Sequence, residues 1–252
     1  PVPLEGTPTE LRPFLDEINF LLQRLAEAVD AQSRFVSDAA HQLRTPIAGI
    51  RAQAEAALAA GDGESARHAL SRIAHAAQNM GDLVQKLLVL ARMDAAENTL
   101  HLASLDAAEV AREVAREWVP RALERGVEIG FDQQPGGSVL QGDALLLKEM
   151  LGNLIDNALR YGATRIAVST GCSAQGACWR VTDNGPGIPA AQRGAVFAPF
   201  HRIAHGVEGA GLGLTIVQRI AQLHGATVEL GDAGEGSGLA VTIRFPSRPE
   251  PA

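Results

Sequence analysis

The chain has 252 residues, of which 46% are hydrophobic and 20% charged, so it can bury one large core or two smaller ones. This composition excludes a wholly disordered chain. The formal net charge is −7, and no stripe of Lys or Arg is present, which excludes the usual electrostatic signature of a nucleic-acid-binding protein.

The sequence contains no apolar run of transmembrane length and no signal peptide. Because the chain begins with Pro1 rather than Met, we expect a fragment of a longer protein whose membrane segment lies upstream. Cys172 and Cys178 are expected to be reduced thiols in the cytoplasm.

A long helical pattern follows residues 1–10, which are rich in turn-forming residues. Its apolar residues alternate steps of four and three, which predicts a coiled-coil seam. They are Leu11, Leu15, Ile18, Leu22, Leu25, Val29, Val36, Ala39 and Leu43. Pro46 disturbs the pattern, because proline kinks a helix and removes a backbone hydrogen bond. The Gly61-Asp62-Gly63 segment is expected to end the helix.

A second helix is predicted from about residue 64 to residue 91, with the same alternation of apolar residues. Two such helices joined by a short glycine loop form an antiparallel hairpin. A single hairpin would leave its apolar stripe half exposed, and a second copy would bury it in a four-helix bundle. We therefore expect a homodimer.

After about Ala103 the period of the pattern changes, and helices alternate with strands. The predicted strands are Val127–Phe131, Arg165–Ser169, Cys178–Thr182, Thr227–Gly231 and Leu239–Phe245. The predicted helices are 106–125, 144–161 with Asp143 as its N-cap, and Leu214–Leu223 with Gly225 as its C-terminal stop. This order predicts a sheet with helices on one face, so the fold class is a helical hairpin followed by an α/β sandwich.

His41 is the first candidate for chemistry. In the first helix it sits away from the core-facing Leu43, and Thr45 shares its face four residues later. An exposed, unprotonated imidazole is a good nucleophile at neutral pH. Taken alone, however, the pattern also describes an ordinary surface histidine beside a proline kink.

The segment from Asp38 to Pro46, DAAHQLRTP, resembles the phosphoacceptor box of histidine kinases, and it is similar to the subfamily of tricarboxylate-transport sensors. The resemblance implies that His41 accepts a phosphoryl group and that Thr45 helps to place water for dephosphorylation. Most of the family has an acid after the histidine to accept its proton. Gln42 stands there instead, and an amide can orient the imidazole by a hydrogen bond but cannot act as a general base.

The helix 144–161 carries a polar face with Glu149, Asn153, Asn157 and Arg160. Asparagine oxygens can bind Mg²⁺, a hard cation that prefers oxygen. The pattern resembles the N box of the Bergerat-type ATP fold. By that resemblance Asn153 binds Mg²⁺, Asn157 and Arg160 approach the phosphates, and Tyr161 packs near the nucleotide.

A glycine-rich loop, DNGPGIP, begins at Asp183 at the end of a predicted strand. A carboxylate there can accept a hydrogen bond from the N6 amine of adenine, and Gly185 and Gly187 let the backbone approach the base. An ordinary Asp-Asn-Gly turn would have the same composition. In this position the segment strongly resembles the G1 box of the same family, which adds Ile188 to the expected nucleotide site.

Two further segments resemble the F and G2 boxes. In the F box, Phe200 is expected to anchor a lid that covers about residues 203–208, and Arg202 to meet phosphate. His201 and His205 have metal-ligand spacing, but scattered polar lid residues are the better interpretation. The G2 box offers backbone N–H groups to phosphate at the start of a helix. Its expected binding residues are Gly209, Gly211, Leu212, Gly213 and Leu214.

Together, the phosphoacceptor box and the four boxes of the nucleotide site imply a sensor histidine kinase of a two-component system, with ATP and Mg²⁺ as cofactors. Residues 1–30 are interpreted as the end of a HAMP relay, 31–100 as the dimerisation and phosphotransfer domain, and 105–248 as the ATP-binding domain. The implied partners are a second copy of the chain and a response-regulator receiver domain, and the implied location is the cytoplasmic side of a bacterial inner membrane.

Two alternatives stay open on the residues alone. One is another Bergerat-fold ATPase in which Glu149 activates water. The other is a dimeric relay that holds nucleotide without catalysis.

Overall fold

The computed structural model describes residues 11–59, 62–96, 100–134, 139–173, 176–203, 209–234 and 237–246. The chain divides into two compact units, Pro1–Met80 and Gly81–Ala252. Within the described ranges, none of the helices combines the length and the apolar character that crossing a membrane requires.

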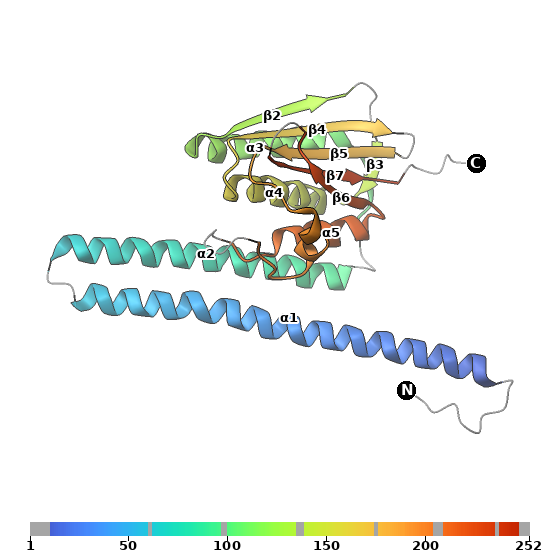
Figure 1. The fold of residues 1–252 in the computed structure, drawn as a ribbon, viewed down its shortest axis with the longest axis horizontal. Coiled ribbons are helices and arrows are strands. Elements are labelled where there is room, and N and C mark those ends of the chain that lie inside the picture. The colour runs from blue at the N-terminus through green and yellow to red at the C-terminus, as the bar shows by residue number, and fades with distance from the viewer. Residues whose placement is uncertain are drawn as a thin grey trace. The chain divides into compact units, whose positions relative to one another are not determined.

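The first unit contains helix α1 (Arg12–Ala59) and the beginning of helix α2 (Gly63–Ala96), which run antiparallel as a hairpin (Figure 1). Asp62 caps α2, since its Oδ1 accepts hydrogen bonds from the backbone N–H groups of Glu64, at 2.9 Å, and Ser65, at 2.7 Å. Helix α1 continues through Pro46 without a break, so the proline disturbs the hydrogen-bond ladder but does not divide the helix.

The apolar stripe of α1 is exposed in the single chain. Leu25 is 61% exposed and Val29 is 54% exposed, and the same holds for other large apolar side chains along this helix. A hairpin built this way leaves unburied a surface that favours association with another apolar face.

The second unit contains a five-stranded sheet with the order β2-β4-β5-β7-β6. Strands β2 and β4 are parallel, and the other neighbours are antiparallel. The strands are β2 (Glu128–Gln133), β4 (Arg165–Ser173), β5 (Gly176–Asp183), β6 (Thr227–Asp232) and β7 (Leu239–Arg244). Each of the five predicted strands is therefore present, with its ends shifted by a few residues.

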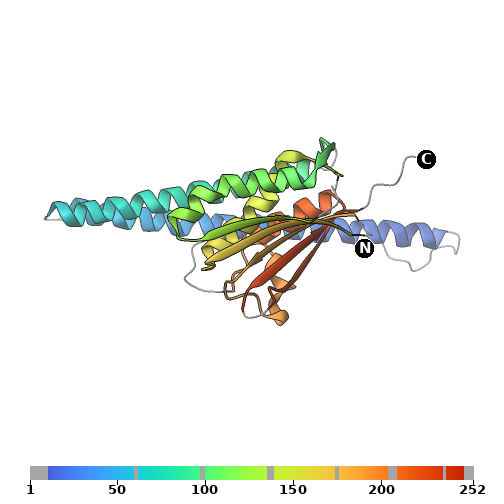
Figure 2. The ribbon, with the colours of Figure 1, turned by 90° about the horizontal axis from the view of Figure 1, so that it is seen from above.

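Three helices cover one face of this sheet and make the second layer of the sandwich (Figure 2). They are α3 (Ala107–Glu124), α4 (Ala144–Arg160) and α5 (Gly213–Leu223). Asp143 caps α4 as predicted, because its Oδ1 accepts hydrogen bonds from the backbone N–H groups of Leu145 and Leu146.

The core of the second unit lies between the sheet and these helices. Trp179 of β5 is fully buried, donates its indole N–H to the Ala107 carbonyl at 3.0 Å, and meets the Phe245 ring edge to face at 5.0 Å. His224 joins the end of α5 to the start of α4, since its Nε2 accepts the Asp143 N–H at 3.0 Å. These contacts hold α4 and α5 on the same sheet face.

Two short strands were not predicted. Strand β1 (Ala103–Asp106) pairs with β3 (Val139–Gly142) in a separate two-stranded antiparallel sheet. Each has four residues, too few to establish an alternating pattern, and the pairing joins segments more than thirty residues apart. Only the tertiary contact specifies them.

Candidate active site

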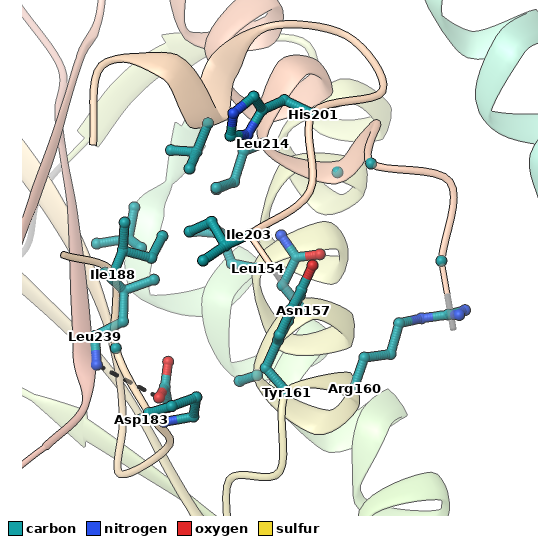
Figure 3. A pocket seen from close by; sticks show the side chains of 18 of the residues that line it. Leu154, Asn157, Arg160, Tyr161, Asp183, Ile188, His201, Ile203, Leu214 and Leu239 are labelled. Atoms are coloured by element: carbon teal, nitrogen blue, oxygen red, sulfur yellow. Dashed lines mark hydrogen bonds between the residues drawn. The ribbon is translucent and has the colours of Figure 1, made fainter. Parts of the chain in front are cut away.

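A cavity of about 300 Å³ opens beside α4 and α5 in the second unit (Figure 3). The fold brings together at this cavity residues from the N, G1, F and G2 boxes. The predicted residues that line it are Asn157, Arg160, Tyr161, Asp183, Gly187, Ile188, Gly209, Gly211, Leu212, Gly213 and Leu214. Four other predicted residues of this unit, Asn153, Gly185, Phe200 and Arg202, are not among the lining residues.

Asp183 stands at one end of the cavity, at the end of β5. Its Oδ1 accepts the N–H of Gly185 at 2.8 Å and that of Leu239 at 3.4 Å, and Figure 3 shows the other carboxylate oxygen turned toward the cavity. Burial raises the pKa of this carboxyl above its usual value, although the two backbone hydrogen bonds act in the opposite direction. A fixed acceptor of this kind suits an exocyclic amine.

Two glycines close to Asp183 in the fold, one in the loop after β5 and one just before β7, are required by close backbone contacts. A Cβ on Gly187 would lie 2.8 Å from the Gly238 carbonyl oxygen, and Gly187 has a φ of 72°. A Cβ on Gly238 would lie 2.2 Å from the Asp183 carbonyl oxygen, at a φ of 147°. Only glycine fits both requirements, so the carboxylate is held by a tightly packed backbone.

Asn184 fastens this loop to the sheet. Its Oδ1 accepts the N–H groups of Thr164 and Arg165, at 2.9 and 2.8 Å, and its Nδ2 donates to Thr164 Oγ1. Asn184 lies within the recognised motif, but no sequence pattern distinguishes a residue that joins the loop to the sheet in this way.

The opposite part of the cavity is formed where α4 meets the start of α5. Asn157 contacts Gly213 closely, since a Cβ on that glycine would lie 2.7 Å from Asn157 Oδ1. Gly213 begins α5, where backbone N–H groups and the helix dipole favour an anion. This end of the cavity therefore suits phosphate.

Asn153 lies on α4 and is 3% exposed. Its Nδ2 donates to the carbonyl oxygen and to Oε1 of Glu149, both at 2.9 Å, whereas its Oδ1 is buried and has no hydrogen-bond partner. A buried oxygen without a partner costs free energy, and coordination to a hard cation would remove that cost. The residues present thus fit a Mg²⁺ ion at Asn153.

Arg160 at the end of α4 belongs to a network of charges. Its Nε contacts Asp156 Oδ2 at 2.9 Å, and the same oxygen accepts from Lys86 Nζ at 3.0 Å. Burial raises the pKa of Asp156, but the two cations outweigh this effect and hold it below its usual value. The stability that this carboxylate contributes is therefore present at neutral pH and is lost as the pH falls through the lowered pKa.

The F box and the G2 box pack against each other through their backbones. Phe200 has a φ of 61°, a left-handed conformation that is strained for a non-glycine residue. A Cβ on Gly211 would lie 2.8 Å from the Phe200 carbonyl carbon and from the His201 carbonyl oxygen. This turn directs His201 to the cavity wall, beside Leu214 (Figure 3).

Several lining residues were missed by sequence reasoning, including Lys86, His201, Ile203 and Leu239. Lys86 and Leu239 come from segments outside the recognised boxes, and no local signal distinguishes them. His201 stands inside a box, and the less favoured metal site that it could form with His205 is not tested, because His205 lies outside the described residues. Within the described part of the chain, no cluster of three metal-binding side chains occurs.

His41 lies on the exposed surface of α1, in the first unit. Thr45 is also exposed, and its hydroxyl donates to the His41 carbonyl oxygen at 3.3 Å. Gln42 is partly buried. The structure thus presents the histidine to solvent on a continuous helix.

Two family models match the chain. The model described as the His Kinase A (phospho-acceptor) domain matches residues 31–96, and the model described as the histidine kinase-, DNA gyrase B- and HSP90-like ATPase matches residues 142–249. The two matches contain His41 and the cavity residues of α4, β5 and α5.

Curated sensor proteins are similar over nearly the whole chain. The sensor protein kinase PmrB of Pseudomonas aeruginosa is 37% identical over 252 residues, which is 98% of this chain and 52% of PmrB. The sensor protein QseC of Salmonella typhi is 34% identical, over 97% of this chain and 54% of QseC. The chain thus spans about half the length of the curated relatives that it matches.

Solved structures of histidine kinases are also similar to this chain. The histidine kinase AdeS of Acinetobacter baumannii, with a TM-score of 0.65 and 23% identity, covers 83% of this chain and 98% of its own, and shows the shared fold. Full-length ShkA in complex with AMPPNP has a TM-score of 0.60 and 26% identity, over 87% of this chain and 47% of ShkA. The chain combines the phospho-acceptor and ATPase domains of a two-component sensor histidine kinase.

Proposed function

We propose that the chain binds ATP in the cavity of the second unit, transfers the γ-phosphoryl group to His41, and passes it to an aspartate of a response-regulator receiver domain. The observation that carries this proposal is an exposed histidine in the matched phospho-acceptor segment, on the same chain as a cavity whose two ends suit adenine and phosphate. The AMPPNP complex of ShkA, a structural relative, supports the nucleotide assignment.

In the proposed binding mode the adenine amine donates to Asp183, and the phosphates lie toward Asn157, Arg160 and the start of α5. Glycine backbone N–H groups and the α5 dipole stabilise the phosphate charge there. Asn153 is proposed to hold Mg²⁺, which when bound would neutralise charge on the transferring phosphoryl group. The task of the protein is mainly to position the phosphates and to neutralise their charge.

In the transfer step an unprotonated ring nitrogen of His41 attacks the γ-phosphorus in line. An N–P bond forms, the bond from the γ-phosphorus to the β,γ-bridging oxygen breaks, and ADP carries away the electron pair. Gln42 cannot accept the imidazole proton, so its proposed role is to orient the ring, and the proton passes to solvent. Thr45 is proposed to place water when the phosphorylated regulator is hydrolysed.

The exposed stripe of α1 supports the proposal of a homodimer in which a second hairpin completes a four-helix bundle. We further propose that residues 1–30 relay signals from a membrane segment of the full-length protein on the cytoplasmic side of a bacterial inner membrane. The proposed boundaries are 31–100 for the phosphotransfer domain and 105–248 for the ATP-binding domain. The likeness to tricarboxylate-transport sensors stays a prediction.

The function is tested by incubating the chain with γ-labelled ATP and Mg²⁺ and following protein-bound, acid-labile label. We expect labelling of the wild type, none of His41→Ala, and equal ATP affinity of both by calorimetry. His75→Ala is the matched control, because His75 is exposed on α2 of the same hairpin. Full labelling of His41→Ala would exclude His41, and release of phosphate without any phosphoprotein would indicate an ATPase that uses Glu149.

A further inference from the structure

One residue that lines the cavity belongs to α2, a helix that lies outside the segment matched by the ATPase model. Lys86 lines the cavity together with residues of α4, β5 and α5. The part of α2 that carries it belongs to the second unit, and its apolar neighbours Leu83, Leu90 and Met93 are buried, with Met93 fully enclosed. Lys86 is therefore held at the cavity by a packed helix.

The ammonium group of Lys86 is fixed by a short ion pair. It lies 3.0 Å from Asp156 Oδ2, and the two side chains are only 20% and 14% exposed. The same oxygen accepts from Arg160 Nε at 2.9 Å, and Arg160 also contacts Asp82 of α2 at 3.5 Å. Four charged side chains of α2 and α4 thus form one network with two cations and two carboxylates.

Both cations of this network adjoin the part of the cavity that suits phosphate. Lys86 and Arg160 are lining residues, and a Cβ on Gly209 of the G2 box would lie 3.9 Å from Arg160 Cδ. Figure 3 shows Arg160 on the opposite side of the cavity from Asp183. A polyphosphate entering here would bring negative charge to the two cations, in competition with the carboxylates that hold them.

We propose that Lys86 is a nucleotide-positioning residue that binds the phosphate end of ATP beside Arg160, and that Asp82 opposes this binding by holding Arg160. The inference rests on the proposed nucleotide-binding function. It makes α2 a participant in nucleotide binding, so that the C-terminal part of the second hairpin helix contacts the substrate directly.

The main test compares the affinities of the full chain for ATP and for adenosine by calorimetry. Lys86→Met is expected to weaken ATP binding by about ten-fold or more, the effect of losing one hydrogen bond to a charged group, and to leave adenosine binding unchanged. Lys86→Arg is expected to restore most of the ATP affinity, because the charge returns.

The chain offers a matched control in its second lysine. The sequence has two lysines, Lys86 and Lys148, and Lys148 pairs with Glu113 at 2.7 Å away from the cavity lining. Lys148→Met is expected to bind both ligands as the wild type does. Equal ATP affinity of Lys86→Met and the wild type would overturn the proposal, and equal weakening of ATP and adenosine would show that Lys86 has only a structural role.

A wild-type chain that binds neither ligand would instead overturn the proposed function itself.

A second measurement, chemical modification of the lysines, does not depend on a variant. ATP should protect Lys86, but not Lys148, from an amine-specific reagent followed by mass spectrometry, and adenosine should protect neither. Undiminished modification of Lys86 in saturating ATP would also contradict the proposal.

The last test concerns Asp82, the carboxylate that is proposed to compete with the phosphates for Arg160. Asp82→Asn is expected to tighten ATP binding roughly two- to five-fold, a modest effect because Asp82 is 43% exposed and its ion pair with Arg160 is long. Adenosine affinity should not change. Unchanged or weaker ATP binding by Asp82→Asn would show that this carboxylate does not oppose the phosphates.

Discussion

The two units present their functional groups in opposite ways. His41 stands exposed on a helix whose apolar stripe is also exposed, whereas the second unit surrounds its cavity with a buried sheet, tightly packed glycines and an ion-pair network. The first unit carries the proposed nucleophile, His41, with little local environment, and the second unit supplies the packed environment of the proposed nucleotide site. Substitutions in the second unit should therefore be costly, and those in the first should be tolerated unless they touch His41 or the stripe.

The largest effect is expected for Gly238→Ala. The added Cβ would lie 2.2 Å from the Asp183 carbonyl oxygen, and the φ of 147° is strained for alanine, so we expect a loss of about 3 kcal/mol or more in unfolding free energy. Urea unfolding followed by circular dichroism measures it. Gly234→Ala is the control, because its φ of 109° is also unfavourable but no atom lies within 4 Å of the added Cβ. Equal losses in both variants would assign the effect to φ alone.

A charge placed in the stripe of α1 should break the proposed dimer and leave the second unit intact. Leu25 is 61% exposed in the single chain, so Leu25→Glu would cost little in an isolated hairpin but about 2–3 kcal/mol in a buried interface. Sedimentation should shift from dimer to monomer, with adenosine affinity unchanged. Gln23→Glu, two residues away and outside the apolar stripe, is the control. A dimer that survives Leu25→Glu would place the interface elsewhere.

Asp183→Asn should change the stability of the fold and the affinity for ATP in opposite directions. The pKa of Asp183 is raised by burial, so its ionised form is disfavoured in the folded state and costs stability above that raised pKa. We expect the variant to melt slightly higher than the wild type, by a few degrees at most, at neutral pH and to converge with it as the pH falls below about 3.8. ATP affinity should fall by about a hundred-fold, since adenine loses its charged acceptor. A lower melting temperature at neutral pH would contradict this assignment.

The smallest effect is expected for Gly49→Ala in the first unit. Gly49 lies inside α1 with no atom within 4 Å of an added Cβ, so alanine should raise helix stability by about 1 kcal/mol. Thermal unfolding of the hairpin measures it, and labelling of His41 should persist. A loss of stability would indicate that a second chain contacts this glycine closely.

The sequence predicted most of the scaffold, because the helices and the five main strands have clear periodic patterns and Asp143 is a strong cap. It did not predict β1 and β3, whose pairing is purely tertiary. At the site, the boxes indicated Asp183, Asn157 and four glycines that line one cavity, Gly187, Gly209, Gly211 and Gly213, whereas the predicted Gly185 is not a lining residue. Lys86 was not predicted because the helical segment around it has only an apolar periodicity and no recognisable motif. Its position beside Asp156 depends on how α2 and α4 pack together.

Pro46 makes α1 easier to bend at one point. The proline has no N–H to donate to the Gln42 carbonyl, so the ladder lacks a bond in the turn that carries His41, although the helix runs on to Ala59. About 50 Å of helix precedes this point, counted from Arg12 at about 1.5 Å per residue. A bend of about 10° there would displace the far end of the helix by about 9 Å, so a small change of angle beside His41, the proposed phosphoacceptor, produces a large movement at the start of α1.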